Sequence, residues 1–326
     1  MIVLWFLAMF FFLFVLLKSA DYFIDNSMVL GQILKVPSFV MGATVIAFGT
    51  SLPELAVSIS AILEDKASIV SGTVIGSNIS NIFFILGTAL IIGKGFKVDF
   101  KEYFTTIIIL FFTTALTSYF LWDNFYSITE GIISVVLLLL YVVYIVFFKK
   151  SDEEEEEHEH VFSYKPILLI LLSGVGIWLG AELVIFSIQK VAVLLSIPED
   201  LISLTIIALG TSLPELAVTI VAVKKQKYGI VLGNIIGSNI FNSLCVLGLP
   251  TVIGHYTNHP YIISEAVFTN FSIPLMLLAV VLVFFLSLFN KASKVFGYLF
   301  VLFYLLFIVG TFLELDFFKL FNNFLT

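Results

Sequence analysis

Long apolar stretches recur along almost the whole chain, and each is about long enough to cross the roughly 30 Å hydrocarbon layer of a membrane as a helix. Soluble proteins rarely contain repeated stretches of this length. The pattern predicts ten transmembrane spans, at residues 2–17, 39–63, 68–93, 103–121, 128–148, 166–189, 200–223, 228–253, 262–288 and 295–317. The predicted fold class is therefore an all-α membrane protein whose surroundings are the lipid bilayer.

The composition supports this class, because 60% of the residues are hydrophobic and only 12% are charged. A soluble globule of this composition would expose more apolar surface than its core could hide. The first span has no basic residue before it and no small-residue cleavage site after it, so we interpret it as a membrane helix rather than a signal peptide. The single cysteine, Cys245, lies in an apolar run. This excludes an intrachain disulfide framework and a cysteine-based zinc site.

The positive charges fall mainly on one side of the predicted membrane. The chain has no arginine, and with ten spans thirteen of its 16 lysines lie in loops on one side. The other three are Lys66, Lys190 and Lys319. Because cytoplasmic loops carry the basic excess, the count predicts a multi-pass cell-membrane protein with both termini outside.

One polar segment divides the spans five and five. Ser151–His160 (SDEEEEEHEH) holds seven acidic residues and two histidines, and removing those acids leaves 23 − 7 = 16, equal to the 16 lysines. The predicted organisation is a five-helix half at 1–148, an acidic cytoplasmic linker at 149–165 and a second five-helix half at 166–326. A run of like charges favours an extended, solvated loop, and a weak cation-collecting or regulatory role is the alternative.

The two halves contain an internal repeat, which aligns without a gap at an offset of 161 residues. Residues 42–61 (GATVIAFGTSLPELAVSISA) match 203–222 (SLTIIALGTSLPELAVTIVA) at 14 of 20 positions, and 72–87 match 233–248 at 9 of 16. The repeats, at about 39–93 and 200–253, are separated by five spans, so the second enters the membrane from the opposite side. Inverted repeats with Gly and Pro inside apolar spans are typical of secondary transporters, whose broken helices form a site near the bilayer midplane.

Two glutamates occupy equivalent places in the repeats, Glu54 and Glu215 of the motif GTSLPEL. An ionised side chain at this depth costs several kcal/mol unless something neutralises it. Symmetric copies are expected to meet near the pseudo-two-fold axis, where a divalent cation relieves both their repulsion and their desolvation. The plainer alternative is that each glutamate caps or packs its helix and snorkels or stays protonated.

Oxygen atoms around these glutamates complete a shell suited to Ca²⁺ and Na⁺. Pro53 and Pro214 donate no backbone hydrogen bond, so the carbonyls four residues earlier are free to coordinate. Helical spacing places five residues of each repeat on one stripe. These are Ala47 (through its backbone), Thr50, Ser51, Glu54 and Ser58, and Ala208, Thr211, Ser212, Glu215 and Thr219.

The next span of each repeat adds a hydroxyl and an amide four residues apart, Ser77 with Asn81 and Ser238 with Asn242. They share a helix face and are candidate ligands, and polar packing between helices is the alternative. For Asn78 and Asn239, one residue off that face, packing is the favoured interpretation. Glycines 72, 76, 233 and 237 are expected to permit close approach of the backbones.

Several function classes are disfavoured. No histidine lies at membrane depth to make a proton relay or a transition-metal site. Ser51 and Ser212 have no His, Lys or Asp nearby to act as a base, which argues against a hydrolase. A passive cation channel would also use acidic residues inside the membrane. Channel pores usually form by symmetry about the membrane normal, however, whereas these repeats are inverted. We expect no enzyme activity, no cofactor, no nucleic-acid partner, and a protein that functions as a monomer.

The paired GTSLPEL and GSNI-x-N blocks resemble the alpha repeats of the sodium/calcium exchanger branch of the calcium/cation antiporter superfamily, in its compact prokaryotic form. The resemblance implies exchange of Ca²⁺ for Na⁺ across a prokaryotic inner or plasma membrane. It also implies that Glu54 and Glu215 share calcium with the backbone oxygens of Thr50 and Thr211. The sodium sites that it implies use Ala47, Ser51 and Ser77, and Ala208, Ser212 and Ser238.

One departure from the family concerns Asn81 and Asn242, because several relatives place an aspartate at one of these positions. With two amides the site has two formal negative charges, enough for one Ca²⁺ or two Na⁺. The departure puts the three-for-one stoichiometry typical of the family in doubt. A proton-coupled or K⁺-dependent divalent-cation antiporter of the same fold is therefore the alternative function.

Overall fold

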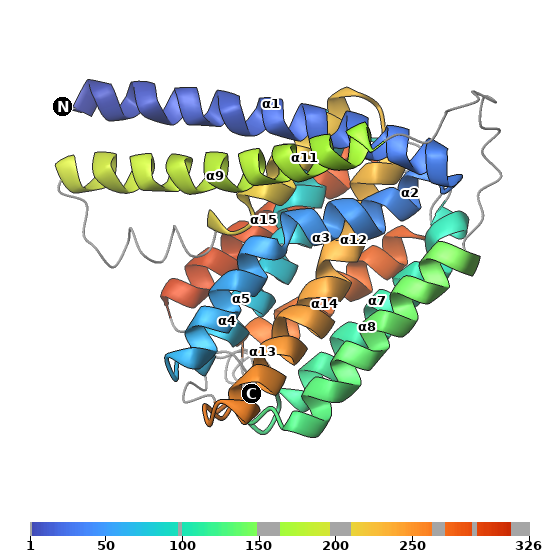
Figure 1. Cartoon of the computed structure of the whole chain (residues 1–326), viewed down its shortest axis with the longest axis vertical. Helices are drawn as coiled ribbons and strands as arrows, with labels where there is room; N and C mark the ends of the chain where they lie inside the picture. Colours follow the sequence, from blue (N-terminus) through green and yellow to red (C-terminus); the bar gives the residue numbers. More distant parts are fainter. Residues whose placement is uncertain are drawn as a thin grey trace, which may run out of the picture. The chain divides into compact units, whose positions relative to one another are not determined.

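The structure is a computed structural model that describes residues 2–96, 100–148, 164–195, 210–262, 271–288 and 292–313. Helices make up the regular structure of these ranges (Figure 1). The chain divides into two compact units, Met1–Pro53 with Tyr144–Asn234, and Glu54–Val143 with Ile235–Thr326. Each unit therefore takes segments from both halves of the sequence.

Two long helices of the first unit, α1 (Ile2–Leu34) and α9 (Lys165–Leu194), lie side by side (Figure 1). A small residue permits this close packing, as is common between membrane helices. A Cβ added at Gly180 of α9 would lie 2.9 Å from the Leu16 Cα. The α1 helix continues well past residue 17, where the predicted span ends, because its second half buries Ala20, Phe23 and Ile24.

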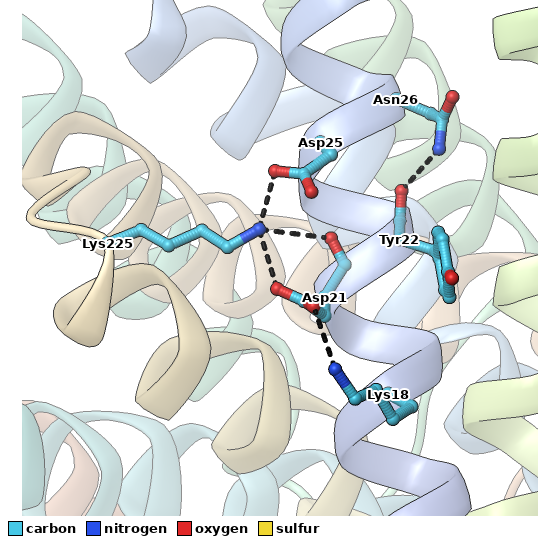
Figure 2. Close-up of polar contacts among 6 residues, drawn as sticks. All are labelled: Lys18, Asp21, Tyr22, Asp25, Asn26 and Lys225. Atoms are coloured by element: carbon cyan, nitrogen blue, oxygen red, sulfur yellow. Dashed lines mark hydrogen bonds and ion pairs between the residues drawn. The ribbon is translucent and has the colours of Figure 1, made fainter.

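An ion-pair cluster joins this second half of α1 to the end of α11 (Leu213–Lys224) (Figure 2). The Lys225 ammonium lies 2.6 Å from an Asp21 carboxylate oxygen and 2.5 Å from one of Asp25, and Lys18 lies 3.6 Å from Asp21. Partial burial opposes the charge on Lys225, but hydrogen bonds from the ammonium to the two aspartates hold its pKa above its usual value. Lys18 and Lys225 were both predicted in loops on the lysine-rich side of the membrane, and the cluster brings these two regions into contact.

In both repeats a new helix begins directly after the serine of the GTSLPEL motif, and in the first repeat this point is a break in a longer helix. In the first repeat, α2 (Ser38–Met41), the π-helical turn η1 (Gly42–Ile46) and α3 (Ala47–Thr50) run up to Ser51, and α4 (Leu52–Leu63) departs at 43°. Ser51 has φ −93° and ψ 6°, and Ser212 before α11 has φ −85° and ψ 1°. This sparsely allowed backbone region is common at functional sites. The proline two residues later in each motif fits the first turn of a new helix.

The second unit holds two further repeat spans, each with a π-helical turn in its middle. The first is α5 (Ala67–Ile79), η2 (Ser80–Leu86) and α6 (Gly87–Ile92). The second is α12 (Tyr228–Phe241), which begins in the first unit, followed by η3 (Asn242–Val246) and α13 (Leu247–Tyr256). Single π turns inside α-helices occur frequently at functional sites.

Four further helices complete the second unit. They are α7 (Phe100–Phe120), α8 (Ile128–Phe148), whose end lies in the first unit, α14 (Ile273–Leu286) and α15 (Lys294–Phe312). The α15 helix packs along α6 and η2, and α14 packs along α7. Ser127 and Glu130 form a capping box at the start of α8, where Glu130 Oε2 accepts from the Ser127 amide at 2.7 Å.

Loop contacts within the second unit agree with the predicted sidedness. Three loops predicted on the lysine-poor side meet one another: Asp65 contacts His259 at 2.9 Å, and the Tyr126 amide donates to the Tyr261 carbonyl at 3.2 Å. On the lysine-rich side, the Phe96 amide donates to the Ala292 carbonyl at 3.1 Å. Loops expected on one side thus contact loops expected on that same side.

Seven of the described helices, counting each kinked span as one, are long and apolar enough to cross a membrane, and the bent pair at Ser38–Leu63 makes an eighth. The predicted spans 200–223 and 262–288 lie partly outside the described residues. Their described parts are α11 and the apolar helix α14. The prediction of a helical membrane protein is confirmed, and the count of ten spans stays a prediction.

Candidate ion-binding site

The predicted ion-binding residues divide between the two compact units, and each group has its own buried polar cluster. In the first unit the Ser51 hydroxyl donates to Glu215 Oε1 at 2.9 Å. Both side chains are buried, and the other carboxylate oxygen, Glu215 Oε2, has no hydrogen-bond partner among the described residues. This bond joins the first repeat, which supplies Ser51, to the second, which supplies Glu215.

A buried amide links further members of this cluster. Asn234 Oδ1 lies 3.2 Å from the Thr50 hydroxyl, and Asn234 Nδ2 donates to the Thr219 hydroxyl at 3.4 Å. The Thr50 hydroxyl also faces the Ala47 carbonyl at 3.3 Å. Asn234 therefore bridges the broken helix of the first repeat and α11 of the second.

A glycine pair brings these segments close. A Cβ added at Gly42 of η1 would lie 2.8 Å from the Ile230 carbonyl oxygen and 3.1 Å from the Gly233 Cα of α12. The close approach predicted for Gly233 is confirmed. Gly76 does not share this role, because a Cβ there would meet nothing within 4 Å.

The second unit places Glu54 in the first turn of α4 and Ser77 on α5. The Ser77 hydroxyl donates to Glu54 Oε1 at 3.3 Å, and both side chains are buried. Glu215 likewise lies in the first turn of its helix, α11. Amide groups at a helix N-terminus favour negative charge, which offsets part of the cost of burying each carboxylate.

Asn81 and Asn242 are amides of the second unit that the described residues leave unsatisfied at both ends of the side-chain group. Asn81 in η2 and Asn242 at the start of η3 occupy equivalent repeat positions and are fully buried. Neither the oxygen nor the nitrogen of either side chain has a hydrogen-bond partner among the described residues. Since an unmade buried hydrogen bond costs about 1–3 kcal/mol, this environment favours a ligand at both amides.

The neighbouring amides, Asn78 and Asn239, are bonded through their nitrogen atoms, whereas their oxygen atoms have no hydrogen-bond partner among the described residues. Asn78 Nδ2 donates to the Ser243 hydroxyl at 2.9 Å, and Asn239 Nδ2 donates to the Ile235 carbonyl at 2.7 Å. The Thr117 hydroxyl donates to the Ser243 carbonyl at 3.3 Å. These contacts tie α5 and α7 to η3.

The other predicted ligands have less informative surroundings. Ala47 and Ser238 are buried, Thr211 is half-buried, and Ser212 is buried with no hydrogen-bond partner for its hydroxyl in the described part of the chain. Ala208 lies outside the described residues.

Sequence reasoning missed Asn234 and Ser243, although the internal alignment carried a signal for both. Asn234 stands opposite Thr73 in the repeat, and Ser243 stands opposite Ile82. A polar side chain that is present in an apolar span of one repeat, but not at the equivalent position of the other, needs a hydrogen-bond partner of its own. Thr50 and Thr219 are that partner for Asn234, and Asn78 is that partner for Ser243.

Comparison with known proteins defines the class. The family model for "Sodium/calcium exchanger protein" matches the chain twice, at residues 3–150 and 165–313. Together with the apolar helices, the two matches define a multi-pass membrane transporter built from two copies of one family domain, and not an enzyme. The chain belongs to the sodium/calcium exchanger family, as its repeat motifs predicted.

Individual relatives cover most of the chain. It is 32% identical over 341 residues to the sodium/calcium exchanger MaX1 of Methanosarcina acetivorans, covering 91% of this chain and 95% of that protein. It is 33% identical over 253 residues to the inner membrane protein YrbG of Escherichia coli, covering 72% of this chain and 75% of that protein. A solved structure of the sodium-calcium exchanger NCX_Mj, soaked with Na⁺ and Sr²⁺, has a TM-score of 0.81 and 30% identity, covering 95% of this chain and 99% of that one.

Proposed function

We propose that the protein is a secondary active antiporter that exchanges Ca²⁺ for Na⁺ across a prokaryotic cell membrane. The proposed ligands are the two glutamates with the neighbouring hydroxyl, amide and backbone oxygens of both repeats. They are Glu54, Glu215, Thr50, Thr211, Ser51, Ser212, Ala47, Ala208, Ser77, Ser238, Asn81 and Asn242. The observation that carries the proposal is the buried bond from Ser51 to Glu215, which combines both repeats in one polar cluster.

The chemistry of the ligand set favours hard cations. Carboxylate, hydroxyl, amide and carbonyl oxygens suit Ca²⁺ and Na⁺, whereas soft metals prefer sulfur or imidazole. Glu54 and Glu215 are the buried carboxylates among the described residues. A buried carboxylate is costly without a counter-charge, so bound cations stabilise the loaded protein.

Exchange follows from competition for this ligand set. In the proposed cycle, Ca²⁺ or Na⁺ occupies Glu54 and Glu215, and the loaded site opens alternately to the two sides of the membrane. An empty site leaves two carboxylates without counter-charge in a medium of low dielectric constant, so the empty protein crosses poorly between the two states. Coupled exchange is therefore favoured over leak. The cytoplasmic placement of the acidic linker, the outside placement of both termini and function as a monomer belong to the same proposal.

Reconstituted protein tests the function directly. In proteoliposomes loaded with Na⁺ and diluted into Na⁺-free medium, we expect uptake of radiolabelled Ca²⁺ that disappears when the internal Na⁺ is replaced by choline. Glu54→Gln and Glu215→Gln should each reduce this uptake by about 100-fold or more, because either change removes a counter-charge worth several kcal/mol.

Glu64→Gln is a matched control, because Glu64 is exposed and its ion pair is with the nearby Lys66, away from the proposed ligands. Its uptake should equal that of the wild type. Ca²⁺ uptake that needs no Na⁺ gradient and survives Glu54→Gln would contradict the proposal. Uptake driven instead by a pH gradient, or only with K⁺ present, would establish the proton-coupled or K⁺-dependent alternative.

A further inference from the structure

A buried polar contact in the second unit joins the first repeat to the second. Asn78 lies on α5 and Ser243 lies in η3, and the Asn78 Nδ2 atom donates to the Ser243 hydroxyl at 2.9 Å. Both side chains are fully or almost fully buried. Hydrogen bonds between polar side chains help to hold membrane helices together, so this bond holds η3 against α5.

Each partner of this bond is also held by a further helix. The Met276 sulfur of α14 lies 3.8 Å from the same Asn78 Nδ2 atom, so the two hydrogens of the amide have two acceptors. The Thr117 hydroxyl of α7 donates to the Ser243 carbonyl at 3.3 Å. The side chain of Asn78 and the backbone at Ser243 are therefore each fixed by more than one contact.

The two bonded residues directly follow two proposed ion ligands. Asn78 follows Ser77, whose hydroxyl donates to Glu54 Oε1 at 3.3 Å. Ser243 follows Asn242, whose amide has no hydrogen-bond partner among the described residues. Since consecutive Cα atoms are about 3.8 Å apart, the bond limits how far the backbones of Ser77 and Asn242 can separate.

The internal repeat does not supply a second copy of this bond. The repeat partner of Asn78 is Asn239, and the repeat partner of Ser243 is Ile82, whose side chain has no polar atom. Asn239 Nδ2 donates instead to the Ile235 carbonyl of its own helix, at 2.7 Å. Ser243 is therefore not explained by the shared motif, and its hydroxyl fixes the spacing of the repeats on one side of their pseudo-symmetry.

From these contacts we infer that Ser243 is a positioning residue for ion binding, which holds Asn242 at the spacing from Ser77 that binding requires. The inference rests on the proposed exchange function, because it takes Ser77 and Asn242 as ligands. Ca²⁺ binds oxygen atoms at about 2.3–2.6 Å, so a small shift of one ligand weakens binding. Loss of the Ser243 hydroxyl should therefore lower ion affinity and leave the rate of the loaded protein nearly unchanged.

Ser243→Ala tests the inference in the proteoliposome assay of Na⁺-dependent Ca²⁺ uptake. The half-saturating Ca²⁺ concentration should rise about fivefold to tenfold, while the maximal rate per folded protein stays within about twofold of the wild type. Ser243→Thr, which keeps a hydroxyl, should restore both quantities to within about twofold. Thr117→Val, which loses the bond to the Ser243 carbonyl, should raise the half-saturating concentration by a smaller factor.

Ser118→Ala is the matched control. Ser118 is a buried serine of the same unit, and its hydroxyl donates within its own helix, to the Thr114 carbonyl at 2.8 Å. Its half-saturating Ca²⁺ concentration should equal that of the wild type. Isothermal titration with Ca²⁺ in detergent should give the same ranking of the variants without any transport step.

A double variant tests whether Ser243 acts through Asn78. Asn78→Leu should also raise the half-saturating Ca²⁺ concentration, and adding Ser243→Ala to it should raise that concentration by less than about twofold more. Residues that act through one bond are not additive, whereas independent residues are. Effects that multiply in the double variant would overturn the inference.

The outcomes separate this inference from the exchange function. A folded Ser243→Ala protein with a lower melting temperature and wild-type half-saturation would show that the bond only stabilises the fold. That result, or equal shifts in Ser243→Ala and Ser118→Ala, would overturn the inference and leave the exchanger proposal intact. Wild-type protein without any Na⁺-dependent Ca²⁺ uptake would overturn both.

Discussion

The amide of Asn234 in the first compact unit and the amides of Asn81 and Asn242 in the second are all buried in repeat helices, but their surroundings differ. Asn234 contacts side chains with both its oxygen and its nitrogen. Asn81 and Asn242 make no hydrogen bond to the described residues. A satisfied amide stabilises the fold, whereas an unsatisfied one costs free energy that a bound ligand or water recovers. The difference separates a structural amide from candidate ion ligands.

Among the amides of this comparison, the largest effect on transport is expected from replacing the two unsatisfied ones. Asn81→Leu or Asn242→Leu removes a buried amide that the described residues do not bond and keeps a similar side-chain volume. We expect Na⁺-dependent Ca²⁺ uptake to fall at least about tenfold, with a melting temperature equal to or above that of the wild type. Uptake per folded protein and thermal unfolding in detergent measure the two quantities. A variant with normal transport and lower stability would show that these amides are structural.

The reciprocal change at Asn234 should affect stability first. Asn234→Leu leaves the Thr50 and Thr219 hydroxyls without this partner, at a cost of about 1–3 kcal/mol of unfolding free energy. The melting temperature should therefore fall by several degrees, and uptake per folded protein should change less than in Asn81→Leu. Asn234→Gln, which keeps an amide acceptor and donor, serves as a partial rescue. A loss of transport without loss of stability would place Asn234 among the ligands.

Smaller effects are expected from the two hydroxyls that donate to the glutamates. Ser51→Ala removes a 2.9 Å bond to Glu215, and Ser77→Ala removes a 3.3 Å bond to Glu54. Since a hydrogen bond to a charged group contributes about 1.5–3 kcal/mol, the Na⁺ concentration for half-maximal Ca²⁺ exchange should rise about tenfold in Ser51→Ala. The longer bond predicts a smaller rise in Ser77→Ala. A larger effect in Ser77→Ala would reverse this ranking of the two clusters.

The smallest effect is expected at the ion-pair cluster of Figure 2, which lies in the same unit as Glu215 but at the end of its helix. Lys225→Gln removes partly exposed pairs, which typically contribute less than about 1 kcal/mol each. The melting temperature should fall slightly, less so in high salt, while uptake stays near that of the wild type. Lys224→Gln, at an exposed neighbour, is the control. A loss of transport in Lys225→Gln alone would give this cluster a functional role.

The sequence predicted where the membrane helices lie, but it was less accurate about where they end and did not predict their π-helical turns. The span predicted at 2–17 is the start of α1, which runs to Leu34. Hydropathy ends the span at Lys18, but Asp21 and Asp25 continue the helix because they contact Lys225, which lies 200 residues away from Asp25 along the chain. The π-helical turns at Ser80–Leu86 and Asn242–Val246 were also not predicted, because one extra residue in a turn leaves an apolar stretch apolar.

The amino-acid sequence by itself determined the class of protein, its two repeats and the equivalent positions of Glu54 and Glu215. These follow from apolar length, internal identity and the cost of charge in lipid, which are properties of residue order alone. Only the tertiary structure decided that Ser51 donates to Glu215, that Asn234 is satisfied and that Asn81 and Asn242 are not. Hydrogen bonds between distant segments depend on how the helices pack, and neighbouring amides with the same local sequence can therefore have different partners.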